Sequence, residues 1–256
     1  MFVVLTNDDG IYSKGLRYIY KALLGAGHQV QVIAPLGEQS GMGHALTVFN
    51  PLRVKPVEEE GFSGLAVNGT PADCVKLGLS RLAARKPDLL LSGINAGGNV
   101  GPDILYSGTV SAAAEGAAMG CPSLAVSHNS RILADTESYA RFTVGLIPKI
   151  PWAELPLRRA LNLNFPSCPL GSCRGLRVCP QTSAVWRDWY DERKDPRGQS
   201  CWWMNGVIPR ELVEPGTDKD LLEQGWATLT PLKFEFTDYA GLDLLSSRLG
   251  PESPLS

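Results

Sequence analysis

The stretch that decides the fold is FVVLTNDDG, residues 2–10. Its apolar residues run without polar alternation, which is typical of a strand buried on both faces of a parallel sheet. The run stops at the adjacent carboxylates of Asp8 and Asp9, followed by Gly10. Open α/β sheets bind ligands at the carboxyl ends of their strands, so the two acids are candidate site residues. Asp-Gly is also common in turns, and these residues alone leave a turn and a ligand site equally open.

The composition predicts a globular protein with a sizeable core, because 44% of the 256 residues are hydrophobic. The formal net charge of −2 supplies no basic field for nucleic acid or an anionic membrane. No apolar run approaches the length that crosses a bilayer, and the amino terminus lacks the features of an export signal. We therefore expect a cytoplasmic protein with neither a nucleic acid nor a membrane as partner.

A strand–helix–strand rhythm continues from the first strand. Ser13 precedes a helical pattern with Leu16 and Ile19 on one face, and a second strand is predicted over residues 30–34. Such a unit is parallel and right-handed. The polar, glycine-containing loop after the second strand holds Ser40. Its hydroxyl is either an ordinary loop-tip group or a group aimed at the crevice beside the first strand.

Helix-start and glycine signals organise the next segment. Thr70 and Asp73 have the spacing of a capping box, which predicts the start of a helix. A strand predicted over residues 89–92 opens into the glycine-rich loop 93–101, which contains Asn95. No Gly-x-Gly-x-x-Gly follows the first strand and no Walker pattern occurs, so a dinucleotide site is not indicated.

An alanine-rich helix is predicted over residues 110–119, directly after Ser107, Gly108 and Thr109. The free backbone N–H groups at such a helix start form an anion site, which the two hydroxyls would assist. The alternative is an ordinary Ser/Thr helix cap, a far commoner feature than a phosphate site.

The remaining elements are read from shorter patterns. Extended segments are predicted at 47–57 and 65–67 around a loop at 58–64, and a helix at 139–147. The tail from Pro251 is predicted to be disordered. Further strands are predicted over residues 124–127, 161–164, 176–180 and 225–230.

Aromatic residues crowd a charged stretch that has a turn signal at residues 196–198. This pattern predicts a β-hairpin that carries exposed aromatic side chains. Either a partner surface or a local aromatic core over the sheet would account for them, and the sequence favours neither. The residues are Trp186, Trp189, Tyr190, Trp202 and Trp203.

Four candidate ligands share one position in the predicted topology, just after the carboxyl ends of parallel strands. They are Asp8, Asp9, Ser40 and Asn95. Carboxylate, hydroxyl and amide oxygens select a hard cation such as Mg²⁺ or Mn²⁺. Zinc is not indicated, because the six cysteines form no Cys-x-x-Cys pair and only three histidines are present. A hard cation beside an anion-binding helix start predicts phosphoryl chemistry.

Five motifs resemble those of the SurE family of stationary-phase survival proteins, in the family's order. The resemblance implies a Rossmann-like three-layer αβα core with a mostly parallel sheet, plus a C-terminal β-hairpin and arm. It also implies a metal-dependent 5′-nucleotidase, which hydrolyses nucleoside 5′-monophosphates with one divalent cation, Mg²⁺ or Mn²⁺, per subunit. The motifs are TNDDG at 6–10, QSG at 39–41 followed by GH at 43–44, GTPAD at 69–73, SGIN at 92–95 and SGTV at 107–110.

The same resemblance implies a role for each matching residue. The metal ligands would be Asp8, Asp9, Ser40 and Asn95. The catalytic residues would be Asp8, Asp9, Asn95 and Asp103. Contacts to the substrate and its phosphate would come from Ser40, Gly41, Asn95, Ser107, Gly108 and Thr109.

The resemblance also implies how the chain is organised. Residues 1–130 would form the core with the site, within a single SurE-like domain that residues 131–256 complete. A hairpin at about 184–208 and a C-terminal arm would mediate a homodimer or homotetramer. One position departs from the family: some members carry a histidine near the active site after the Thr237-Asp238 pair, where this chain has Tyr239.

Two rival functions have sequence features that discriminate them. Receiver-like signalling modules also place an acid pair around Mg²⁺, but they are about half this length and need an aspartate after the third strand. Here Leu91-Ser92-Gly93 occupies that position. The other rival is a non-catalytic oligomeric protein that acts through its aromatic hairpin. Release of phosphate from a nucleotide would distinguish the enzyme from both rival functions. In the enzyme, either water or Asp8 attacks phosphorus.

Overall fold

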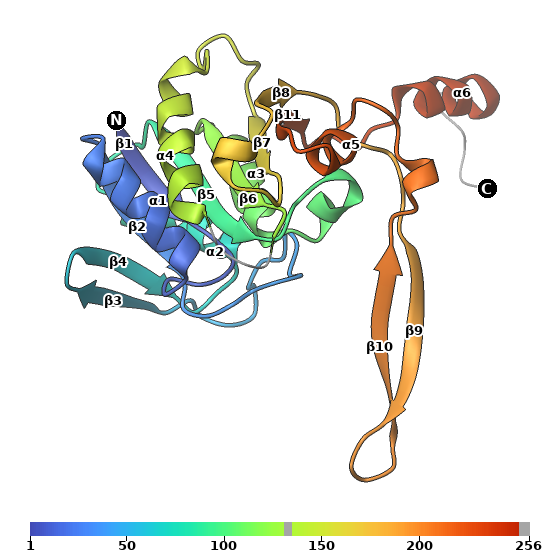
Figure 1. The fold of residues 1–256 in the computed structure, drawn as a ribbon, viewed down its shortest axis with the longest axis horizontal. Coiled ribbons are helices and arrows are strands. Elements are labelled where there is room, and N and C mark those ends of the chain that lie inside the picture. Colours follow the sequence, from blue (N-terminus) through green and yellow to red (C-terminus); the bar gives the residue numbers. More distant parts are fainter. Residues whose placement is uncertain (131–134, 251–256) are drawn as a thin grey trace.

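The structure is a computed structural model that describes residues 1–130 and 135–250. The tail from Pro251, for which disorder is predicted, lies outside the described residues, as do residues 131–134. The described chain forms a nine-stranded, mostly parallel sheet in the order β3-β4-β2-β1-β5-β6-β7-β11-β8 (Figure 1). The strands of this sheet are β1 (Phe2–Thr6), β2 (Gln29–Pro35), β3 (Val54–Glu59), β4 (Phe62–Val67), β5 (Leu89–Ala96), β6 (Ser123–His128), β7 (Arg159–Phe165), β8 (Leu176–Val178) and β11 (Ala227–Lys233).

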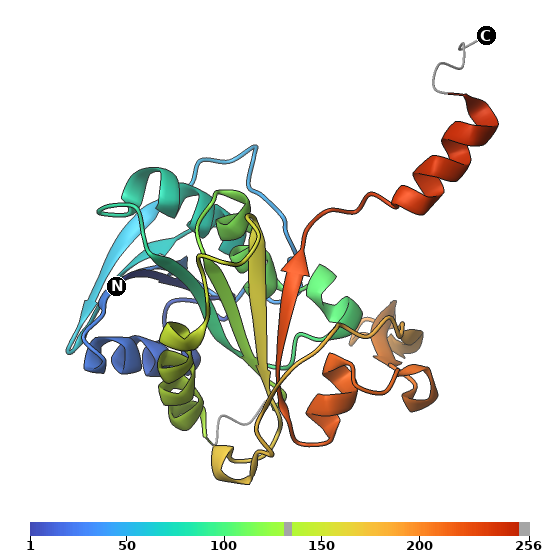
Figure 2. The same cartoon turned by 90° about the horizontal axis from the view of Figure 1, so that it is seen from above.

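Helices cover both faces of the sheet, so the α/β class with a three-layer core is confirmed (Figure 2). α1 (Lys14–Gly25) packs beside α4 (Thr136–Leu146) on one face, and α2 (Pro71–Leu77) packs beside α3 (Gly108–Ala118) on the other. β1 is buried along its whole length, which explains its unbroken apolar run.

The topology reverses direction at β1. From β1 the chain builds outward through β2 and β4, and it then returns to place β5 on the opposite side of β1. β1 and β5 pair in parallel, with Thr6 opposite Ser92. This reversal is the topological switch point of an open α/β sheet, where a crevice forms beyond the carboxyl ends of the strands.

The local helix signals are confirmed. The Ser13 hydroxyl accepts a hydrogen bond from the backbone N–H of Leu16 at the start of α1. Thr70 and Asp73 form the predicted capping box at the start of α2, and Ser107 caps α3. These signals are reliable because each needs only residues within one helical turn.

Several strand boundaries differ from the predictions: β3 begins only at Val54 within the extended segment predicted at 47–57, and β8 already ends at Val178. β5 runs on to Ala96, so Asn95 lies within a strand, beyond a register shift in its pairing with β6. β3 and β4 leave only Glu60 and Gly61 between them, because the left-handed φ of +70° at Gly61 allows a tight turn. β11 continues through Pro231, which is tolerated because β8 pairs only with the first three residues of β11.

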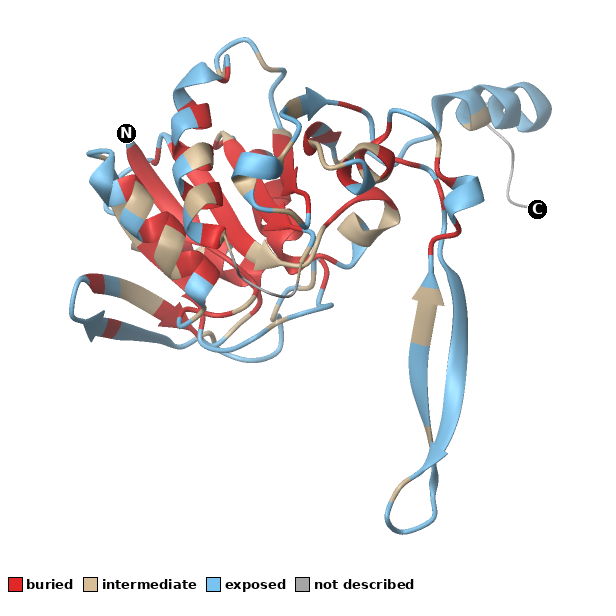
Figure 3. Cartoon of the chain, viewed as in Figure 1, coloured by how far each residue is buried: buried red, intermediate tan, exposed pale blue. Residues whose placement is uncertain are grey.

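Two elements contribute little to this core (Figure 3). β9 (Arg187–Lys194) and β10 (Ser200–Val207) form the predicted hairpin as a separate two-stranded sheet that extends away from the body. The helix α6 (Tyr239–Leu249), which the sequence patterns did not reveal, has no buried residue. In the part of the chain that the structure describes, no helix is long and apolar enough to cross a membrane.

Candidate active site

A cavity of about 270 Å³ lies at the carboxyl ends of β1 and β5. It brings together residues from the β1–α1 turn, the loop after β2, the end of β5 and the start of α3. Among the predicted site residues, Asp9, Gly108 and Thr109 do not line it. The lining residues are Asp8, Ser40, Gly41, Asn95, Ala96, Asn99, Asp103, Tyr106 and Ser107.

The turn after β1 is shaped by Asn7. Its side-chain amide donates to the carbonyl of Gly10 (3.0 Å) and to the hydroxyl of Ser13 (2.7 Å), which links the end of β1 to the cap of α1. Gly10 has a φ of +90°, and a Cβ there would lie 3.0 Å from the backbone of Gly37. Asp9 and Gly10 therefore belong to the turn, whereas the preceding Asp8 lines the cavity, so the two alternatives from the sequence do not exclude each other.

Asp8 is fixed by the start of α3. The backbone N–H of Thr109 donates to Oδ2 of Asp8 over 3.1 Å, and the Thr109 hydroxyl donates to Oδ1. A Cβ on Gly108 would lie 2.8 Å from Cβ of Asp8, so only glycine permits this approach. The loop after β2 is attached at the same point, because the N–H of Gln39 donates to the carbonyl of Asp8 (2.8 Å).

The two acids are electrostatically poised for a cation. Burial raises the pKa of Asp8 above its ordinary value, against the opposing hydrogen bonds from Thr109. Burial and the neighbouring charge of Asp8 raise the pKa of Asp9 to about 6. One buried and one half-buried like charge, side by side, favour a bound proton or cation between them, so the acid pair is suited to a cation.

The neutral candidate ligands offer oxygen atoms. The Nδ2 of Asn95 donates to the carbonyl of Gly97 (2.8 Å), and its Oδ1 accepts no hydrogen bond from the residues that the structure describes. The Ser40 hydroxyl donates to Glu38 (2.8 Å), so its oxygen retains lone pairs. Over the described ranges, no group of three or more His, Cys, Asp and Glu side chains is placed to hold a metal. The carboxylate, hydroxyl and amide oxygens of the candidate residues are of the type that hard divalent cations prefer.

The start of α3 differs from the free anion site that the sequence suggests. The N–H of Thr109 is taken by Asp8, and the N–H of Val110 donates to the Ser107 hydroxyl (3.1 Å). The positive end of the helix thus already stabilises the Asp8 carboxylate. Ser107 still lines the cavity, whereas Thr109 is buried behind Asp8.

Asn99 is a site-lining residue that the sequence reasoning did not single out. Its N–H and carbonyl contact the side chains of Asn164 and Asn162 on β7, and its Nδ2 donates to Ser127 on β6 (2.7 Å). These bonds tie the loop after β5 to the neighbouring strands. Asn162 and Asn164 are two residues apart on a predicted strand, so their side chains point to the same face of the sheet. This pair of amides on one face was the sequence signal that could have indicated a polar partner such as Asn99.

A larger cavity of about 890 Å³ lies beside α3 and β11. Its walls are mostly apolar, with Ile104, Leu105 and Phe236 among them, and the acid pair does not line it. The 3-10 helix η2 (Gly101–Leu105) contributes to both cavities, since Asp103 lines the smaller one. The chemical groups converge in the smaller cavity, which we take as the candidate active site.

Fold and site together define a Rossmann-like α/β protein with a cavity lined by oxygen-bearing side chains at its switch point. The chain belongs to the SurE family: the sequence model of the family described as "Survival protein SurE" matches residues 3–188. The resemblance noted in the motifs is thus confirmed.

Similar proteins extend this relationship over almost the whole chain. The protein named 5′-nucleotidase SurE from Nitratidesulfovibrio vulgaris (Miyazaki F) is 60% identical over 246 residues, covering 96% of this chain and 91% of that protein. Its namesake from the Hildenborough strain is 58% identical over 247 residues, covering 96% and 99%. The crystal structure of the SurE protein from Aquifex aeolicus superposes with a TM-score of 0.82 at 35% identity, covering 97% and 99%.

Proposed function

We propose that this protein is a metal-dependent 5′-nucleotidase that hydrolyses nucleoside 5′-monophosphates to nucleoside and phosphate. The observation that carries the proposal is the cavity in which Asp8, Ser40 and Asn95 converge beside the start of α3, with Asp9 next to Asp8 in the chain. The names of the relatives, 5′-nucleotidase SurE, support the same activity.

Asp8, Asp9, Ser40 and Asn95 would hold one divalent cation, Mg²⁺ or Mn²⁺. The cation would offset the buried like charges, polarise the phosphate ester and lower the pKa of a bound water. Asp8 and Asn95 are held in place by Thr109 and Gly97, so these two ligands are preorganised before an ion arrives.

The phosphate would be bound at the cavity wall formed by Ser40, Gly41 and Ser107. Gly108 keeps the helix start close to Asp8, and Thr109 supports that carboxylate from behind. We assign the attack on phosphorus to water, because both oxygens of Asp8 already accept hydrogen bonds from Thr109. Asp103 faces the same cavity and would move a proton at its carboxylate.

We further propose a homodimer or homotetramer that forms through the hairpin and the C-terminal arm. Four aromatic residues of the hairpin are exposed, as are four leucines of α6, and large exposed apolar areas favour a protein partner. Light scattering should give two or four copies, and replacing Trp202 and Trp203 with serine should reduce that number. An unchanged oligomer would contradict the hairpin's role. The exposed residues are Trp189, Tyr190, Trp202, Trp203, Leu242, Leu244, Leu245 and Leu249.

Residues 1–130 supply every proposed metal ligand and phosphate contact, and we regard residues 131–256 as the completion of one SurE-like domain. Contacts between Asp218 and Gly101 support this view, because they join the second half to the site (2.9 Å). A cytoplasmic location, no nucleic-acid partner and no membrane partner remain predictions from the sequence.

The direct test is a panel of nucleoside 5′-monophosphates incubated with purified protein in Mg²⁺, Mn²⁺ or EDTA. We expect phosphate release in either metal and its loss in EDTA. No release from any nucleotide in either metal would overturn the proposal and favour a non-catalytic oligomeric protein.

A further inference from the structure

A hydrogen bond joins the candidate active site to the base of the hairpin. The indole N–H of Trp186 donates to Oδ1 of Asp103 over 2.5 Å, although the two residues are 83 positions apart in the sequence. Asp103 lines the site cavity, and Trp186 directly precedes β9. Within the described chain, Oδ2 of Asp103 has no hydrogen-bond partner, so this oxygen is available to a substrate or a water.

The segment that carries Trp186 also holds the helix that carries Asp103. The side chain of Gln181 donates to the carbonyl of Gly101, the first residue of η2 (3.0 Å). A Cβ on Gly101 would lie 2.6 Å from Cγ2 of Thr182, so the Thr182 side chain packs directly against this glycine. η2 is thus held at its first residue by residues 181–182 and at Asp103 by Trp186.

The segment of residues 181–186 is also held by hydrogen bonds to α5 (Asp218–Glu223) and to the loop before α5. Oδ1 of Asp218 accepts from the N–H of Thr182 (2.8 Å), and Oδ2 of Asp218 accepts from the N–H of Gly101 (2.9 Å). Glu214 accepts from the hydroxyls of Thr182 and Ser183. These bonds restrict the movement of the segment from which Trp186 reaches Asp103.

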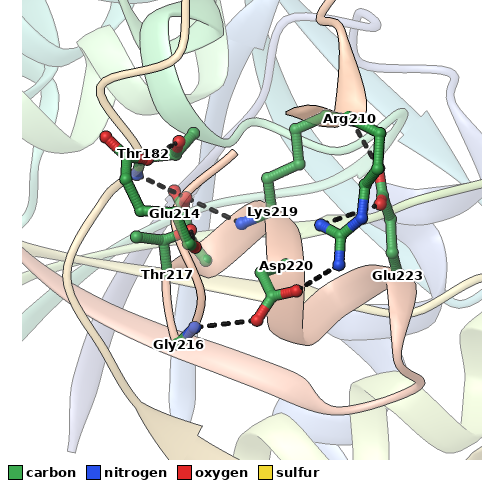
Figure 4. A network of polar contacts seen from close by, with 9 residues as sticks. Thr182, Arg210, Glu214, Gly216, Thr217, Lys219, Asp220 and Glu223 are labelled. Atoms are coloured by element: carbon green, nitrogen blue, oxygen red, sulfur yellow. Dashed lines mark hydrogen bonds and ion pairs between the residues drawn. The ribbon is translucent and has the colours of Figure 1, made fainter. Parts of the chain in front are cut away.

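A second set of contacts secures α5 itself (Figure 4). The guanidinium of Arg210 pairs with Asp220 (2.5 Å) and Glu223 (3.4 Å), and Asp220 also accepts from the N–H of Gly216 (2.7 Å). Arg210 follows the hairpin by three residues, so both ends of the hairpin are attached to this network.

We propose that Trp186 is a positioning residue that holds the Asp103 carboxylate in the orientation needed for phosphoester hydrolysis. The inference rests on the proposed function, because it assigns how Asp103 is oriented within that same site. A Cβ on Gly206 of β10 would lie 2.8 Å from Cε3 of Trp186, so the indole also rests against the hairpin. The orientation of Asp103 therefore depends on the position of the hairpin residues that contact the Trp186 indole.

The test compares Trp186→Phe, which removes the N–H donor and keeps an aromatic ring, with Trp152→Phe as the matched control. The Trp152→Phe substitution also removes one indole hydrogen bond, which Trp152 donates to the carbonyl of Ile147 (3.0 Å). Trp152 does not line the site cavity. For each variant we would measure kcat and KM for a nucleoside monophosphate, Mn²⁺ affinity and the melting temperature. Trp186→His, which restores a ring N–H donor, tests for rescue.

We expect Trp186→Phe to lower kcat about ten-fold while Mn²⁺ affinity and the melting temperature stay at wild-type values. Trp186→His should recover part of that loss, and Trp152→Phe should behave as wild type. In an Asp103→Ala background, Trp186→Phe should have no further effect, because the tryptophan acts through the carboxylate.

A wild-type kcat in Trp186→Phe would overturn the inference, and so would an equal loss in the Asp103→Ala background. A loss of kcat that parallels a fall in melting temperature, without rescue by histidine, would also overturn it. Failure of the proposed function is a separate result, in which wild-type protein releases no phosphate from nucleotides.

Discussion

Thr109 binds both carboxylate oxygens of Asp8, one through its backbone N–H (3.1 Å) and the other through its hydroxyl. This single residue at the start of α3 therefore sets the orientation of the first acid at the end of β1. The relationship explains how a buried carboxylate stays in place at the site, because charge-assisted hydrogen bonds and the positive end of the helix stabilise it.

The first prediction concerns that support. Thr109→Val keeps the shape and the backbone N–H but removes the hydroxyl donor, so Asp8 should bind a cation less well. We expect Mn²⁺ affinity to fall by about 10- to 100-fold, as is common when an outer hydrogen bond to a metal ligand is lost. Thr109→Ser keeps the hydroxyl and is the matched control. Calorimetric titration checks this, and equal affinity in the valine and serine variants would contradict it.

The second prediction concerns pH. The pKa of Asp9 is raised to about 6 by burial and by Asp8, so without a metal this carboxyl gains its proton as the pH falls through that value. Protons then compete with the cation. Asp8, whose pKa burial also raises, competes in the same way, so Mn²⁺ affinity should fall as the pH drops through this value, by up to about ten-fold per unit for each carboxyl that gains a proton. An affinity that stays flat down to the ordinary range of an aspartate would contradict the prediction.

The third prediction concerns stability. His44 and Lys76 hydrogen-bond Glu115 (2.9 and 2.5 Å), and they lower the pKa of this carboxyl to about 2. Because the folded-state pKa lies below the ordinary value, the stabilisation is present above the ordinary range and is lost as the pH falls through the folded-state pKa. At neutral pH, Glu115→Gln should lower the free energy of unfolding by about 1–2 kcal/mol.

Urea unfolding at neutral pH checks this value, with Glu60→Gln as the control. Glu60 is exposed in the turn between β3 and β4, so the same change of charge there should leave stability unaltered. Equal free energies of unfolding for wild type and Glu115→Gln would contradict the role of the cluster.

Sequence patterns predicted the parts of this molecule that depend on neighbouring residues. The apolar run of β1, the cap at Ser13 and the capping box at Thr70 each act within a few positions, and the structure confirms them. The position of the acids at the end of β1 followed from the same local pattern.

Contacts between distant segments could not be predicted in this way. Asn99 and Asn164 are 65 positions apart, and Trp186 and Asp103 are 83 apart, so no local spacing reveals either pair. Asn95 was placed in a loop because its glycine-rich surroundings resemble one, whereas strand pairing with β6 extends β5 past it. The sequence left open whether the groups of Thr109 bind an anion or serve a helix cap, and it did not reveal that its N–H and hydroxyl both donate to Asp8.

The most direct measurement of the central claim is the amount of Mn²⁺ bound per chain, followed by electron paramagnetic resonance, in wild type, Asp8→Asn and the Glu60→Gln control. The account predicts one tightly bound ion per chain in wild type and in the control, and a loss of binding together with phosphatase activity in Asp8→Asn. Unchanged Mn²⁺ binding by Asp8→Asn, with full turnover, would contradict the oxygen-ligand cation site on which the account rests.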